Sequence, residues 1–104
     1  MQTTITARHF DISDSLQERA TAVLAKLENT APRPIDAHVV FDIEGETPTA
    51  EIRLHLSQGE MMVATGEGTD HRSALDRSEE KLRSQLRRVT QAPRRPRKPA
   101  PGEV

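Results

Sequence analysis

Basic side chains are concentrated at the end of the sequence. Residues 81–104 contain eight Lys and Arg residues against one acid, whereas residues 1–80 contain seven against fifteen acids. The formal net charge of −1 therefore hides a basic C-terminal segment and an acidic remainder. Such segregation favours contact between the basic end and a polyanion, although a solvated helix face followed by a soluble tail has the same composition.

A helix is predicted over the start of this basic segment, and its period determines on which side the basic residues lie. At 100° per residue, Arg77, Lys81 and Arg88 fall within about 40° of one another and roughly opposite the apolar stripe of that helix. Arg83 and Arg87 flank them on one side. A membrane surface is a weaker partner, because the apolar stripe is needed for the core. Nucleic acid bound through its phosphates is favoured, and the absence of Tyr and Trp indicates folded RNA rather than stacked single strands.

The remaining residues offer little other chemistry. The chain has no Cys, which excludes disulfides, thiolate zinc sites and Cys nucleophiles. It has no phosphate-loop, dinucleotide-binding, metalloprotease or serine-hydrolase motif, so we expect no catalytic residue, no cofactor and no small-molecule substrate. His38 and His55 are predicted to point outward from neighbouring strands. A metal site usually needs three or four ligands, so we predict none, and a metal or small-ligand protein stays a distant alternative.

Hydrophobic periodicity predicts the elements that position these residues. Period-two alternation predicts strands at 37–44, 50–57 and 61–66, after a Thr-rich strand at 2–8. A 3.6-residue period predicts a helix capped by Ser13 and ending near Asn29, and a second helix from Thr69 or Asp70 to Val89. The predicted core comprises Leu16, Ala20, Val23, Leu24, Leu27, Ala37, Val39, Phe41, Ile43, Ala50, Ile52, Leu54, Leu56, Met62, Ala64, Leu75, Leu82, Leu86 and Val89.

The predicted fold class is α+β with the order β-α-β-β-β-α. A four-stranded sheet has two helices packed on one face, as in dsRBD-like domains. One domain spans residues 1–90, and residues 91–104 form a disordered Arg/Pro-rich tail. The chain shows neither a membrane-spanning apolar run nor a signal-peptide segment, so we expect a cytoplasmic protein without membrane contact.

Short segments spread along residues 1–90 resemble one bacterial family, the short ribosome hibernation-promoting factors of the ribosome-associated translation inhibitor (sigma modulation protein) family. Their order and near-constant spacing carry the resemblance. The segments are Met1-Gln2 with Ile5-Thr6, Asp11-Ile12-Ser13-Asp14-Ser15-Leu16, Ala25-Lys26-Leu27-Glu28, His38-Val39-Val40, Leu54-His55-Leu56, Gly59-Glu60, Gly68-Thr69-Asp70, Lys81-Leu82 and Gln85-Leu86.

The resemblance implies a ribosome-binding factor rather than an enzyme. Members of the family occupy the decoding channel of the small subunit, where tRNA and mRNA would lie, and silence translation in idle or stressed cells. The family's basic residue late in the first helix matches Lys26, and its basic second helix matches Lys81 with Arg83, Arg87 and Arg88. With the residues found by charge alone, the predicted RNA-binding set is Lys26, Arg77, Lys81, Arg83, Arg87, Arg88, Arg94, Arg95, Arg97 and Lys98. The predicted partner is the rRNA backbone near the decoding centre.

The sequence also departs from the family pattern. Ser78 and Glu79 stand where relatives carry apolar residues, so we expect the second helix to cover the sheet less well. His71-Arg72 replaces a hydrophobic residue and Tyr, Ser84 replaces an Arg, and Asp42 makes the outer sheet face more acidic. The linker and C-terminal dimerisation domain of the long members are absent, so we do not expect the chain to pair ribosomes by that route. We also expect a monomer off the ribosome. A diverged member acting as a protein-interaction module without stable ribosome binding is the alternative.

Overall fold

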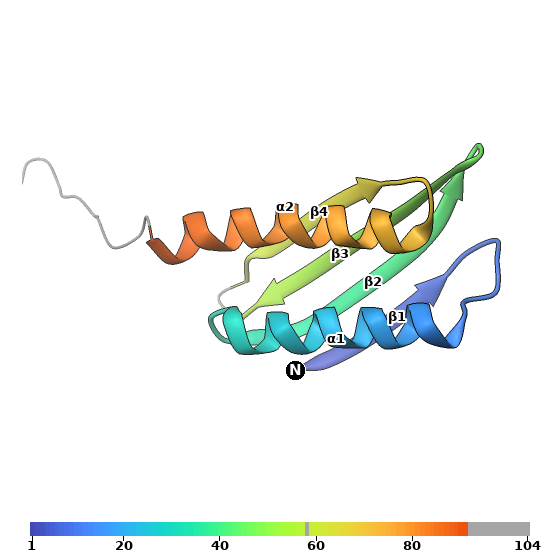
Figure 1. The fold of residues 1–104 in the computed structure, drawn as a ribbon. Coiled ribbons are helices and arrows are strands. Elements are labelled where there is room, and N and C mark those ends of the chain that lie inside the picture. Colours follow the sequence, from blue (N-terminus) through green and yellow to red (C-terminus); the bar gives the residue numbers. More distant parts are fainter. Residues whose placement is uncertain (58, 92–104) are drawn as a thin grey trace, which may run out of the picture.

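A computed structural model describes residues 1–57 and 59–91 of the chain, with side chains up to Arg88. The element order is the predicted β-α-β-β-β-α (Figure 1). The elements are β1 (Gln2–Ala7), α1 (Asp14–Thr30), β2 (Pro34–Glu44), β3 (Thr47–Leu56), β4 (Met61–Glu67) and α2 (His71–Gln91). The predicted tail, with Arg94, Arg95, Arg97 and Lys98, lies outside the described residues, as does Gln58 of the β3–β4 connection.

The four strands form one sheet in the order β1-β2-β3-β4. β1 runs parallel to β2, which requires a crossover connection, and α1 supplies it. β2, β3 and β4 pair antiparallel, which confirms the predicted meander. Gly45 lies in the two-residue turn between β2 and β3 with φ +64°, a conformation that glycine adopts without steric cost.

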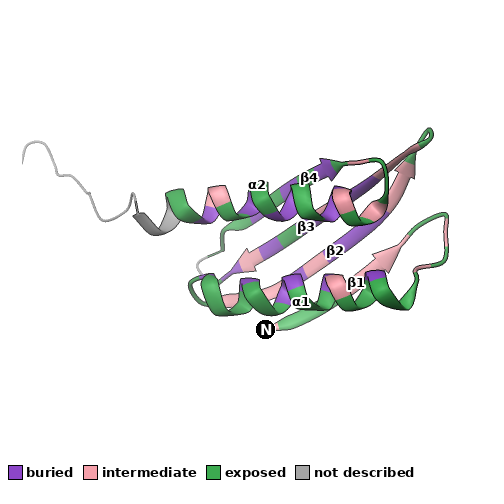
Figure 2. Cartoon of the chain, in the orientation of Figure 1, coloured by how far each residue is buried: buried purple, intermediate pink, exposed green. Residues whose placement is uncertain are grey.

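Both helices lie on the same face of the sheet and run side by side in the same direction (Figure 1). The stripe of α1 predicted from the 3.6-residue period is buried throughout, and Ser13 accepts a hydrogen bond from the Leu16 amide as the predicted cap. The buried surfaces of both helices face the sheet (Figure 2), where Phe41, Ile52 and Leu54 are completely buried. This single layer of aliphatic side chains and one Phe is the core.

Several details differ from the sequence prediction. β2 begins at Pro34 rather than residue 37, because the chain turns at Arg33 and pairs at once with the end of β3 through a register shift. α2 begins at His71 and ends at Gln91, two residues beyond the predicted end. Ile43 is half-buried, and Val40 is buried although it lies on the open face. The side chain of Val89 lies outside the described ones.

α2 packs closely against β4 around Ser78. A Cβ atom on Gly66 of β4 would lie 2.5 Å from the Ala74 carbonyl oxygen and 2.7 Å from the Ser78 amide nitrogen. Ser78 itself is fully buried, and its hydroxyl donates to the Leu75 carbonyl, so its polar group is satisfied within the helix. Small residues on both elements therefore bring the helix down onto the strand, where the sequence comparison led us to expect looser cover.

Within the described part of the chain, no helix is long and apolar enough to cross a membrane.

Candidate nucleic-acid interface

The basic residues of α2 lie on two flanks of the helix, one beside β4 and one beside α1. Arg77 and Lys81 point to the β4 side, and helical spacing places Arg88 on that flank as well. Arg83 points to the α1 side. The 100° spacing predicts Arg77, Lys81 and Arg88 together on the outer face, opposite the leucine stripe. In the structure, Arg77 and Lys81 lie together, but their side chains lie at the β4 edge of the sheet rather than on the outer face of the helix.

Three side chains of α2 bind the free edge of β4, and we call them the β4 edge row. Arg77 Nη1 donates to the Glu67 carbonyl at 3.1 Å, and Lys81 Nζ donates to the Thr65 carbonyl at 2.8 Å. Gln85 Nε2 donates to the Val63 carbonyl at 3.1 Å. The donors stand four residues apart on the helix and the acceptors two apart on the strand. Since β4 is the last strand of the sheet, these bonds cap carbonyls that would otherwise offer an edge to another strand.

On the other flank, basic side chains of both helices converge on one carboxylate. Lys26 Nζ and Arg83 Nη1 lie 3.6 and 3.7 Å from Glu79 Oε2. Arg19 Nη2 lies 3.7 Å from Glu79 Oε1. A hollow between the two helices, the α1–α2 groove, is lined by Lys26, Leu27, Asn29, Thr30, Glu79 and Arg83. The structure thus brings together two predicted site residues, Lys26 and Arg83, that are 57 positions apart.

Sequence reasoning missed Arg19 and the role of Glu79 in this cluster. Arg19 donates two hydrogen bonds to Asp76 Oδ1, from Nε at 3.2 Å and from Nη2 at 2.9 Å. The hydrogen bond to Asp76 raises the pKa of the Arg19 guanidinium above its usual value, and the charges of Asp76 and Glu79 raise it further against the effect of burial. The spacing of Glu79 and Arg83, four residues apart on one helix, was the available signal.

The last described turns of α2 carry two more predicted residues. Arg87 and Arg88 are both exposed, and Arg87 Nη2 donates to the Ser84 hydroxyl at 3.2 Å. Cations in the last turn of a helix also face the negative end of its dipole, which favours them there. Together with Lys26, Arg77, Lys81 and Arg83, they form a basic region that covers both flanks of α2.

The rest of the surface is less suited to RNA. On α1, the solvent-facing residues Asp14 and Glu18 are acidic. Strand alternation places Asp36, Asp42 and Glu51 on the open face of the sheet, and Arg53 there is paired with Glu51 at 3.1 Å. This face also exposes Met61 and Val63. The charges therefore favour the α2 side over the open face for contact with a polyanion.

The histidines of the open face have ordinary hydrogen-bond partners. His38 Nε2 bonds the Thr6 hydroxyl at 2.8 Å, and His55 Nδ1 lies 3.4 Å from Asp36 Oδ2. Strand register pairs His38 with Arg53 and His55 with Asp36, so the two rings do not face each other. Among the described residues, no three ligating side chains are grouped to hold a metal ion.

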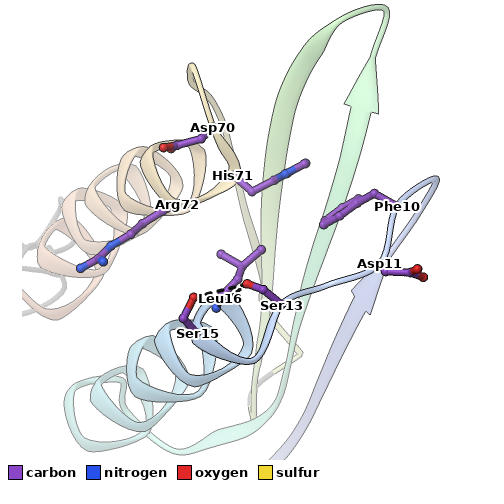
Figure 3. A pocket seen from close by; sticks show the side chains of 8 residues that line it. All are labelled: Phe10, Asp11, Ser13, Ser15, Leu16, Asp70, His71 and Arg72. Carbon is purple, nitrogen blue, oxygen red and sulfur yellow. Dashed lines mark hydrogen bonds between the residues drawn. The ribbon is translucent and has the colours of Figure 1, made fainter.

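A second hollow lies where the two helices begin (Figure 3). Phe10 stacks on the His71 ring with centroids 4.1 Å apart, and His71 Nε2 bonds the Asp42 carbonyl at 2.9 Å. Hydrogen bonds from Ser73 hold the pKa of Asp70 below its usual value at the start of α2. A hydrogen bond from His9 and another from the Ile43 amide likewise lower the pKa of Asp42. These contacts join the β1–α1 loop to α2 and fix the relative position of the two helix starts.

Known proteins resemble this chain over most of its length. The family described as sigma 54 modulation protein / S30EA ribosomal protein matches residues 3–92. The ribosome hibernation promoting factor of Escherichia coli K12 is 38% identical over 86 residues, which cover 83% of this chain and 90% of that protein. The factor of the same name from Salmonella typhimurium is 36% identical over 88 residues, covering 85% of this chain and 92% of that protein.

Two solved structures have the same fold. The N-terminal domain of Thermus thermophilus Protein Y superposes with a TM-score of 0.72 and 26% identity, covering 86% of this chain and 99% of that one. A ribosomal subunit interface protein from Coxiella burnetii superposes with a TM-score of 0.72 and 25% identity, covering 86% and 98%. Sequence and fold agree over the whole described domain, and the chain belongs to the sigma 54 modulation protein / S30EA ribosomal protein family.

Proposed function

We propose that this chain is a non-catalytic ribosome-binding factor. It occupies the tRNA and mRNA decoding channel of the small subunit and silences translation in idle or stressed cells, and therefore works in the cytoplasm. Family membership supports ribosome binding, since the relatives are named for ribosome hibernation and one solved relative for the subunit interface. One structural observation supports the mode of binding: the predicted cations of α1 and α2 gather on one side of the molecule, while acids line the open sheet face.

The proposed contact is between the basic region of α2 and rRNA phosphates. Lys and Arg bind phosphate oxygens without reading bases, which suits a surface without Tyr or Trp. An A-form RNA presents its backbone over a broad face, and a helix with cations on both flanks can reach two phosphate rows. The tail residues Arg94, Arg95, Arg97 and Lys98 follow α2 in the chain and are proposed to extend this contact.

The factor is proposed to be monomeric off the ribosome. An unpaired sheet edge can pair with a strand of another copy. Here the β4 edge row donates to three successive outward carbonyls of β4. This capping supports a monomer in solution.

The exposed Met61 and Val63 on the open face favour one second candidate, a protein-interaction module. Sedimentation of a cell lysate through sucrose separates the two functions. Co-migration with small subunits, lost when tRNA and mRNA occupy the channel, is the expected result. Absence from every ribosomal fraction would contradict the proposal and leave the protein-interaction module.

A further inference from the structure

Glu79 occupies a position that normally costs stability. It lies about 40° from Leu75 and 20° from Leu86 around the helix, within the buried stripe of α2. Only 5% of the residue is exposed, and its Oε2 atom has no hydrogen-bond partner among the described residues. A buried carboxylate oxygen without a hydrogen bond is unfavourable unless something compensates it. The groups that compensate the buried Glu79 carboxylate therefore indicate its role.

Three cations compensate the Glu79 carboxylate, but in two different ways. Arg19 is half-buried, and its guanidinium donates two hydrogen bonds to Asp76. Lys26 and Arg83 are more than half exposed, at 56% and 54% of their side-chain surface. Their nitrogens lie 3.6 and 3.7 Å from Oε2, which is longer than an N–H···O hydrogen bond. Glu79 therefore attracts both side chains without using their donors.

The placement of these two cations suits a single phosphate. Lys26 comes from the last turns of α1 and Arg83 from the middle of α2, and both line the α1–α2 groove. Asn29 and Thr30 complete the α1 side of that groove, with an exposed amide and a hydroxyl that donates to the Lys26 carbonyl. Without an anion between them, a lysine and an arginine from neighbouring helices repel each other and turn away into solvent.

We infer that Glu79 is a positioning residue, which holds Lys26 and Arg83 on either side of the α1–α2 groove so that one phosphate of an RNA backbone binds between them. This inference rests on the proposed ribosome binding and names a phosphate site within it. Glu79 is fixed by its burial in the helix stripe, so it lowers the number of conformations that two long side chains must give up on binding. The phosphate accepts hydrogen bonds from Lys26 and Arg83, whose donors are not used by Glu79.

A simpler role for Glu79 predicts the opposite result. If the carboxylate only offsets positive charge, its removal makes the surface more basic and strengthens RNA binding. If it positions the two cations, its removal weakens binding although the surface becomes more basic. The two roles therefore predict opposite changes in the affinity for RNA when the Glu79 charge is removed.

The test replaces Glu79 by Gln, which keeps size and removes charge, and measures binding to purified small ribosomal subunits from 50 to 200 mM salt. We expect affinity to fall on the order of tenfold, as for the loss of one charge-assisted contact. The slope of log affinity against log salt should become shallower by about 1. Glu80→Gln is the matched control, because Glu80 is exposed on the same helix and its change alters net charge equally. It should leave affinity unchanged or slightly raised.

Two further variants separate positioning from folding. In a Lys26→Gln, Arg83→Gln background, Glu79→Gln should have no additional effect on binding. Glu79→Leu fills the helix stripe with an apolar side chain, so it should keep the thermal midpoint and still lose the affinity; it carries the test if the Gln variant does not fold. Stronger binding with a steeper salt slope, or binding equal to that of Glu80→Gln, would overturn the inference alone. Failure of the unmodified protein to bind small subunits would overturn the proposed function and this inference with it.

Discussion

Salt dependence measures how many cations of the described region neutralise phosphates. Six predicted contacts lie on the α2 side of the molecule: Lys26, Arg77, Lys81, Arg83, Arg87 and Arg88. Each neutralised phosphate contributes about −0.9 to the slope of log affinity against log salt. Because Lys26 and Arg83 share one phosphate, the six cations neutralise five phosphates and give a slope of about −4.5. Affinity for purified small subunits should then fall about five-hundredfold between 50 and 200 mM salt. Filter binding or sedimentation at five or six salt concentrations gives the slope directly.

The double change Lys26→Gln, Arg83→Gln removes the two cations of the α1–α2 groove. It should make the slope shallower by about 1, because the two cations share one phosphate, and lower affinity at 50 mM salt on the order of a hundredfold. The control is Arg53→Gln on the open sheet face, which alters a cation already paired with Glu51 and should leave the slope unchanged. Association that does not depend on salt, or a slope altered by Arg53→Gln and not by the groove pair, would refute the phosphate-contact argument.

Other features of the fold give further predictions. Gly66→Ala should lower the free energy of unfolding by roughly 1–3 kcal/mol, because the added methyl group meets backbone atoms of α2. Denaturant titration measures this change, and an unchanged unfolding midpoint would contradict the close packing of α2 on β4. Lys81→Met uncaps the Thr65 carbonyl and should increase concentration-dependent self-association in sedimentation velocity, whereas Arg88→Met should not. The pKa of Asp42 is lower in the folded protein, so its carboxylate stabilises the fold above about pH 4, and this contribution is lost as pH falls further. Asp42→Asn should therefore make the thermal midpoint depend less on pH between about pH 4 and 2. Truncation after Gln91 should leave the thermal midpoint unchanged and weaken binding to small subunits, and equal binding would show that the tail makes no contact.

Most of the secondary structure of this chain follows from its sequence, because every element except β1 has one buried face. The stripe of α1 from Leu16 to Leu27 repeats every three or four residues, and every member of it is buried. The alternating residues of β3, from Ala50 to Leu56, are buried in the same way. With one apolar face per element and short connections, few arrangements bury all the faces at once, and the observed order is one of them.

The site was less predictable, because its chemistry is at the ends of long side chains. A helical wheel gives the direction of the Cβ atom of Arg77 or Lys81, but the charged nitrogen lies several bonds further and finds the nearest acceptor. Those acceptors are carbonyls of β4, whose position depends on the packing of α2 on Gly66. For the same reason, the sequence showed Glu79 as a departure from an apolar pattern and gave no sign of its two partners on α1.

The division of the basic residues between two flanks has a consequence for how the chain meets RNA. On the β4 flank, Arg77 and Lys81 already donate to carbonyls, so a phosphate there competes with the capped strand edge. On the α1 flank, Lys26 and Arg83 attract an anion without giving up a hydrogen bond. We therefore expect an approaching RNA backbone to gain more from the α1–α2 groove, and the acidic open face to repel the reverse orientation. We expect the groove to set the register of binding, and the β4 flank to strengthen binding once the helix lies against the RNA.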